Sequence, residues 1–195
     1  MRCKAFLFCI IILLSTSCKT EEKPEDVNLN DAPSASVKKL PENYSSDCNE
    51  MYNEAKRLDS ILLVSMDVKD DLAAEAITAF TGFGYYCSTY SLAPVYLIKS
   101  AQVARAVNNI PQAKKSLEFC ISEFPEFRDR PAAMFLLAQL YDERTYLNNR
   151  DEAQRLYREI IEEYPGSDWA QSARGAMSMV GKSDEEIIRM LKKQN

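Results

Sequence analysis

The stretch between Pro94 and Pro165 contains two consecutive copies of one helix–turn–helix pattern. The first copy ends at Pro125, and the second begins at Pro131. Apolar residues in both copies recur with a period near 3.6, which is typical of amphipathic helices, and no stretch alternates as a strand does. Such units stack on one another, because a single unit cannot bury its own apolar face.

The rest of the chain fits the same pattern. Apolar residues make up 46% of the 195 residues and there are only 5 glycines, which favours a packed helical core over a turn-rich β architecture. We expect an all-α domain over residues 47–195, with about eight helices. Their predicted positions are 48–64, 69–87, 94–107, a helix after 109, 131–145, 150–164, 167–180 and a helix from 183.

The two central copies resemble the tetratricopeptide repeat, a helix pair with small residues where its helices cross and a proline that closes the unit. The alanines of the first copy lie at the family spacing, and the second copy has three extra residues in its inter-helix turn. The resemblance implies a short right-handed solenoid of antiparallel helix pairs. The residues that carry it are Ala101, Ala113, Leu117, Pro125, Ala138, Tyr141, Ala153, Tyr157 and Pro165.

Weaker copies flank the centre. Ala76, Phe80 and Phe83 match a second helix of the repeat, with Ser88 where the closing proline should be. In the terminal unit, Gly175 matches the small residue at the helix crossing. The resemblance therefore extends over the whole of residues 47–195.

In this family the first helix of each pair lines the concave side, where peptides bind. By family offset, the groove residues would be Val95, Ile98, Gln102, Arg105, Phe135, Gln139 and Asp142. Some members clamp a peptide carboxylate with polar side chains, but Ile98 and Phe135 stand at such places here. The alternative is that Val95, Ile98 and Phe135 belong to the core between repeats.

Composition argues against catalysis and nucleic-acid binding. The net charge is −5, which provides no broad basic surface for nucleic acid. The chain has no histidine, the commonest general base and metal ligand, and it has no glycine-rich phosphate loop. We expect no catalytic residues, no metal and no cofactor.

Three cysteines lie within 47–195. Cys120 falls at an inward position of its helix, which predicts a buried thiol. Cys48 begins the first predicted helix and Cys87 ends the second, so in an antiparallel hairpin the two lie side by side. We hypothesise a Cys48–Cys87 disulfide, which an oxidising compartment would permit.

The N-terminus resembles a bacterial lipoprotein precursor. Arg2 and Lys4 precede an apolar run over 5–14, too short to cross a bilayer, and small residues then lead to Cys18. The resemblance implies a signal peptide over 1–17 and lipidation, including palmitate, at Cys18. Leu14 lies one place early for that pattern, and a plain cleaved signal peptide is the alternative. Residues 18–46 are rich in charge and proline, which predicts a disordered tether.

Together, these resemblances imply a tetratricopeptide-repeat lipoprotein of the Gram-negative envelope. We expect a membrane-anchored scaffold that binds protein partners, through a peptide segment or in an envelope complex, and assists outer-membrane protein assembly or envelope organisation. The expected location is the periplasmic face of the outer membrane. The alternative is a surface-exposed binding component of a nutrient-uptake or secretion system.

Overall fold

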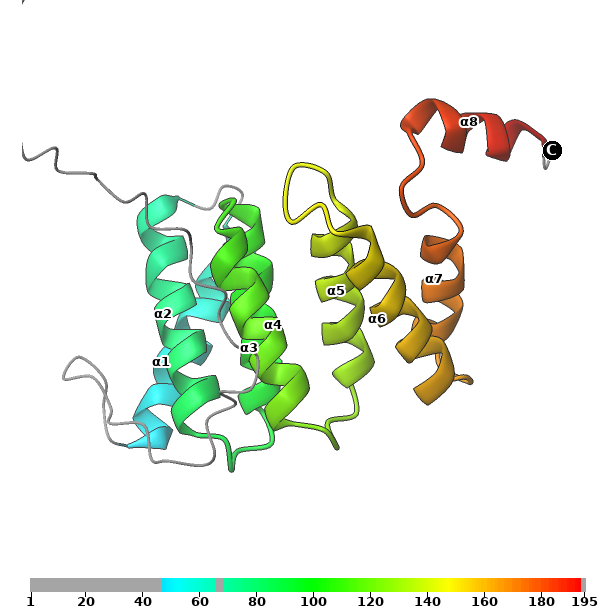
Figure 1. The fold of residues 1–195 in the computed structure, drawn as a ribbon. Helices are drawn as coiled ribbons and strands as arrows, with labels where there is room; N and C mark the ends of the chain where they lie inside the picture. Colours follow the sequence, from blue (N-terminus) through cyan, green and yellow to red (C-terminus); the bar gives the residue numbers. More distant parts are fainter. Residues whose placement is uncertain (1–46, 66–68, 194–195) are drawn as a thin grey trace, which may run out of the picture. The chain divides into compact units, whose positions relative to one another are not determined.

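A computed structural model describes residues 47–65 and 69–193, which form helices joined by turns (Figure 1). The predicted signal peptide, the lipidation site Cys18 and the whole predicted tether over 18–46 lie outside the described residues. In these ranges the elements are α1 Cys48–Val64, α2 Asp70–Tyr86, α3 Ala93–Ala106, α4 Ile110–Glu123, α5 Arg130–Asp142, α6 Arg150–Glu163, α7 Asp168–Met177 and α8 Asp184–Lys193. The all-α prediction is therefore confirmed.

Side-chain caps fix several helix starts where the sequence placed them. Asn109 accepts a hydrogen bond from Gln112 N at 3.3 Å, and Asn149 accepts one from Glu152 N at 3.2 Å. Each satisfies a backbone N–H that the first turn of its helix leaves unbonded. At α8 the box is reciprocal, since Ser183 and Glu186 bond each other's backbone N–H.

Helices that follow one another in the sequence pack against one another, from α1 through α7, and α5 also contacts α7. This order is that of a solenoid, in which each repeat touches its neighbours. The fold is thus a tetratricopeptide-type array of antiparallel helix pairs. The pairs are α1–α2, α3–α4 and α5–α6.

The turns between successive pairs share one backbone pattern. In each, two consecutive bonds link residues three apart and lead into the next first helix, so the chain enters every pair in the same way. The bonds are Tyr90 N→Cys87 O and Ala93 N→Tyr90 O, Phe127 N→Phe124 O and Arg130 N→Phe127 O, and Ser167 N→Tyr164 O and Ala170 N→Ser167 O.

The second helices also repeat one packing pattern. Each contributes a small residue and two larger ones that are almost completely buried, at equivalent distances before the turn that follows. The first pair obeys this rule as predicted, although its turn has Ser88 in place of the proline. The residues are Ala76, Phe80 and Phe83 in α2, Ala113, Leu117 and Cys120 in α4, and Ala153, Tyr157 and Ile160 in α6.

The turn within the α5–α6 pair is longer than its counterpart. α5 ends at Asp142, three residues before the predicted 145, and the segment 143–149 follows. The extra residues are held by backbone bonds from Leu147 N to Leu140 O and from Asn149 N to Tyr141 O. Both turns end alike, because Asn108 and Asn148 adopt left-handed φ angles of 57° and 47° just before the capping asparagine.

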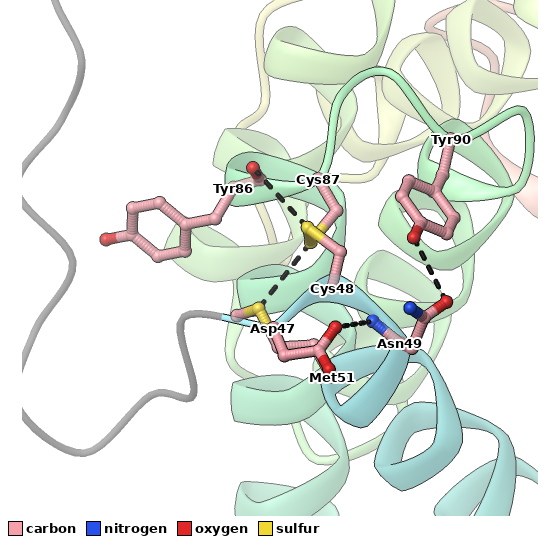
Figure 2. The surroundings of a disulfide bond; sticks show 7 residues. All are labelled: Asp47, Cys48, Asn49, Met51, Tyr86, Cys87 and Tyr90. Carbon is pink, nitrogen blue, oxygen red and sulfur yellow. Dashed lines mark hydrogen bonds between the residues drawn. A yellow bond between two sulfur atoms is a disulfide. The ribbon is translucent and has the colours of Figure 1, made fainter.

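A disulfide closes the first pair. Cys48 at the start of α1 and Cys87 just after α2 are bonded at 2.03 Å, with their Cα atoms 5.7 Å apart (Figure 2). Cys87 is buried, and its sulfur lies 3.6 Å from that of Met51. A bridge across a loop of this size contributes about 2–4 kcal/mol by restricting the unfolded chain.

Aromatic rings fill the core beside this bridge. Phe83 lies 5.5 Å from Tyr52 and 5.4 Å from Tyr96 between ring centroids, and Phe80 lies 5.3 Å from Tyr96. Aromatic pairs of this kind contribute about 0.5–1.5 kcal/mol beyond the area that they bury. The first pair is thus held by large rings from α1, α2 and α3.

Glycines mark where helices approach and where they do not. A Cβ added at Gly84 in α2 would lie 2.5 Å from Cγ of Leu97 in α3, so only glycine fits this crossing. Gly175 in α7 is exposed, and a Cβ there would meet nothing within 4 Å. The prediction that Gly175 sits at a tight crossing of the terminal unit is therefore wrong.

These two glycines provide a matched pair of substitutions. Gly84→Ala should lower the free energy of unfolding by about 1–3 kcal/mol, because the methyl group forces Leu97 out of its position. Gly175→Ala should be neutral or raise it by up to about 1 kcal/mol, since alanine is the better helix former. Urea unfolding followed by circular dichroism measures both. Equal effects of the two substitutions would contradict the close α2–α3 approach.

Candidate functional site

The seven predicted groove residues all lie on α3 and α5, but they divide into two groups. Gln102 and Arg105 are exposed, and Gln139 and Asp142 are half-buried near the end of α5. Ile98 and Phe135 instead pack against the main core, while Val95 is half-buried.

Phe135 illustrates the apolar group. Its ring centroid lies 5.4 Å from that of Tyr157 in α6 and 5.4 Å from that of Trp169 in α7. The ring therefore joins one repeat to the next. For Ile98 and Phe135 the structure favours the alternative of a core between repeats over a free groove wall.

The polar group borders two recesses. The smaller, about 180 Å³, is lined by Gln102, Arg105 and apolar side chains that include Leu136 and Leu140. The larger, about 670 Å³, is the C-terminal recess, named here for its place near the ends of α3, α5 and α7. Its lining includes Arg105, Gln139, Asp142, Glu143, Arg144, Tyr157, Lys182 and Glu185.

Arg105 belongs to both recesses. It donates from Nη1 to Oε1 of Gln139 at 3.4 Å, which links the last turns of α3 and α5. The predicted residues Gln102, Arg105, Gln139 and Asp142 are thus brought together along the surface of the first helices. This surface can offer both donors and acceptors to a bound chain.

The repeat-signature residues have a different role. The four signature alanines, Leu117 and Tyr157 are buried, Tyr141 is half-buried, and the prolines Pro125 and Pro165 lie in exposed turns. The small alanines allow the helices of a pair to approach closely, and a larger side chain would overpack the crossing. These residues build the scaffold that positions the polar surface.

A buried hydroxyl network joins three helices and was not predicted. Ser100 in α3 and Ser116 in α4 are fully buried, and their hydroxyls lie 3.2 Å apart. Thr81 in α2 bonds Ser100 at 2.8 Å, and Gln112 donates to both Thr81 and Ser116. The four polar groups satisfy one another, which avoids the cost of buried unpaired groups.

Arg130 at the start of α5 was also not predicted. It donates to the backbone carbonyl of Ile121 in α4 at 3.1 Å, to Glu163 at 2.9 Å and to the hydroxyl of Tyr164 at 3.0 Å. Its planar fork of donors can bond several acceptors at once. It therefore ties two consecutive repeats together, which is a structural role.

Chemistry is sparse in the described part of the chain. Among residues 47–65 and 69–193, no group of three or more histidine, cysteine or acidic side chains could hold a metal ion. In the same ranges, no helix is both long and apolar enough to cross a membrane. Arg130 and the hydroxyl network are structural, so the accessible polar surface of α3 and α5 is the candidate binding site.

One comparison with known proteins found a match. Residues 132–167 match the family model described as "Tetratricopeptide repeat". The match covers α5 from its third residue, α6 and the turn after them, and so coincides with the second of the two copies seen in the sequence. No curated protein and no solved structure matches the chain.

The free thiol of Cys120 should be inert in the native chain. Burial raises its pKa to about 12, and Arg130 offsets this only in part. At pH 8 roughly one thiol in ten thousand is then a thiolate, which is the reactive form. Iodoacetamide followed by peptide mass mapping should leave Cys120 unmodified in native buffer and alkylate it in urea. Equally fast alkylation in both conditions would contradict its burial.

Proposed function

We propose that the chain is a non-catalytic scaffold that binds a protein partner through the polar surface of α3 and α5. The observation that carries this proposal is that the repeat-signature side chains are mostly buried, whereas polar side chains of α3 and α5 are accessible. The buried alanines pack the helices of the array together. Gln102 and Arg105 do not take part in that packing and remain exposed beside the recesses. The tetratricopeptide match supports a protein partner, since such repeats are protein-binding arrays.

The partner segment that suits this surface is extended or helical. Leu136 and Leu140 provide apolar area in the smaller recess, and Arg105 and Gln139 provide hydrogen-bonding groups beside it. A mixed surface of this kind anchors apolar side chains and orients the backbone of a bound segment. We propose one segment that runs along both helices.

We further propose that Cys18 carries a lipid that anchors the chain to the outer membrane at its periplasmic face, in outer-membrane protein assembly or envelope organisation. The support is the sequence before Cys18, with its basic start, short apolar run and small residues. Each buried lipid methylene contributes about 0.8 kcal/mol, so several chains anchor stably. The alternative is a surface-exposed binding component for uptake or secretion, and protease digestion of intact cells separates the two.

Photo-crosslinking in the native envelope tests the proposed surface. A photoreactive amino acid at Gln102, on the exposed side of α3, should give a discrete crosslinked product, because a partner passes within reach. The same amino acid at Arg158, exposed on the second helix α6, is the matched control and should give none. Products from position 158 alone would show that the partner binds elsewhere. Products from neither position would contradict the proposal that a partner binds this surface.

Metabolic labelling tests the anchor. Labelled palmitate should enter the wild-type chain and be lost from Cys18→Ala, because the thiol is the attachment point. Cys9→Ala, in the apolar run of the same segment, is the control and should keep the label. Label that persists in Cys18→Ala would show that the lipid is elsewhere or that the lipoprotein interpretation is wrong.

A further inference from the structure

The lining of the C-terminal recess includes the hydroxyl of Tyr157, which has no hydrogen-bond partner in the described part of the chain. Tyr157 is only 1% exposed, and within residues 47–65 and 69–193 no hydrogen bond reaches its hydroxyl. Every fully buried side-chain nitrogen or oxygen in those ranges has a partner, so this hydroxyl keeps access to the recess. Burial and the nearby Asp142 raise the pKa of Tyr157 to about 12, which keeps the phenol neutral.

Asp142, the last residue of α5, lines the same recess and is near enough to this phenol to act on it electrostatically. In the described part of the chain its carboxylate forms neither a salt bridge nor a hydrogen bond, although it lines the same recess. The carboxylate of Asp142 and the hydroxyl of Tyr157 thus both line the recess, and both can accept hydrogen bonds from a bound group. The last turn of a helix adds partial negative charge, which favours a cation there.

The cations of the recess itself are directed elsewhere. Arg105 bonds Gln139, and Lys182 bonds the backbone carbonyl of Ser178 at the end of α7. Arg144 acts on Glu185, whose pKa is lowered mainly by hydrogen bonds and partly by this arginine. The pair formed by Asp142 and Tyr157 is therefore left to a cation from outside the chain.

We propose that the C-terminal recess binds an arginine side chain of the partner protein, with Asp142 and Tyr157 as the acceptors of its guanidinium group. Arginine suits the pair better than lysine, because its planar fork offers several N–H donors that reach two acceptors at once. The volume of about 670 Å³ admits a side chain together with flanking backbone. The inference rests on the proposed protein-binding function and names the chemistry of the bound segment.

Titration of the full-length chain in detergent with the peptide acetyl-Gly-Arg-Gly-amide tests this, with binding followed by the NMR signals of labelled tyrosine. Saturable binding should weaken about tenfold in Asp142→Asn, because a charge-assisted bond is lost. Tyr157→Phe, which keeps the packed ring, should weaken it several-fold. Asp151→Asn, an exposed acid outside the recess, is the control and should leave binding unchanged.

Two matched peptides identify the chemistry. With citrulline in place of arginine, the shape remains but the charge is lost, and binding should fall at least tenfold. With glutamate in place of arginine, no saturable binding should occur. The proposal is overturned if citrulline binds as well as arginine, if glutamate binds better, if Asp142→Asn has no effect, or if the arginine peptide does not saturate.

This test is separable from that of the scaffold. Crosslinks from Gln102 without arginine-peptide binding would support the proposed α3–α5 surface and overturn the proposed guanidinium site. Arginine-peptide binding that needs Asp142, without crosslinks from Gln102, would keep the recess and overturn the surface proposed for the partner. Circular dichroism of Tyr157→Phe and Asp142→Asn shows whether each variant is folded, and the conclusion rests on whichever variant is folded.

Discussion

The close approach of paired helices at buried alanines is the interaction on which this array depends. Ala113 in α4 and Ala153 in α6 are fully buried at equivalent positions, and Ala101 and Ala138 of their partner helices are buried in the same core cluster. Because these side chains are small, the larger residues beside them can interlock around the crossing. The same pattern sets the spacing of the first helices, and with it the positions of Gln102, Arg105, Gln139 and Asp142 along one surface.

The first helix pair, α1–α2, has the same packing pattern but is stabilised by additional contacts. α2 keeps the buried alanine and two phenylalanines of the pattern, but its contact with α3 depends on Gly84 and its link to α1 includes the Cys48–Cys87 disulfide. The turn after α2 lacks a proline, yet Cys87 and Tyr90 form the backbone bonds seen in the other turns. A covalent bridge thus supports the pair whose sequence departs furthest from the repeat.

Sequence pattern predicted much of the fold and less of the site. Periodicity and capping residues placed α1 at its observed bounds, and the repeat offsets placed Phe80 and Phe83 in the core. Pattern alone could not show that Phe135 packs between repeats, because an inward and a groove-facing aromatic ring look alike in one sequence. Gly175 was misplaced since a small residue on a helix does not say whether another helix is near. Polar contacts between side chains of different helices also escaped prediction, namely those of Thr81, Ser100, Gln112, Ser116 and Arg130.

The array therefore depends on contacts between neighbouring repeats, and the disulfide stabilises only its first pair. Amide hydrogen exchange of the oxidised and mildly reduced chain measures this most directly. We predict that reduction lowers the protection of amides in α1 and α2 and leaves those of α5, α6 and α7 unchanged, since these helices pack mainly against α4 and one another. An equal loss of protection in all helices would contradict the account, because it would show one cooperative core rather than a nearest-neighbour array.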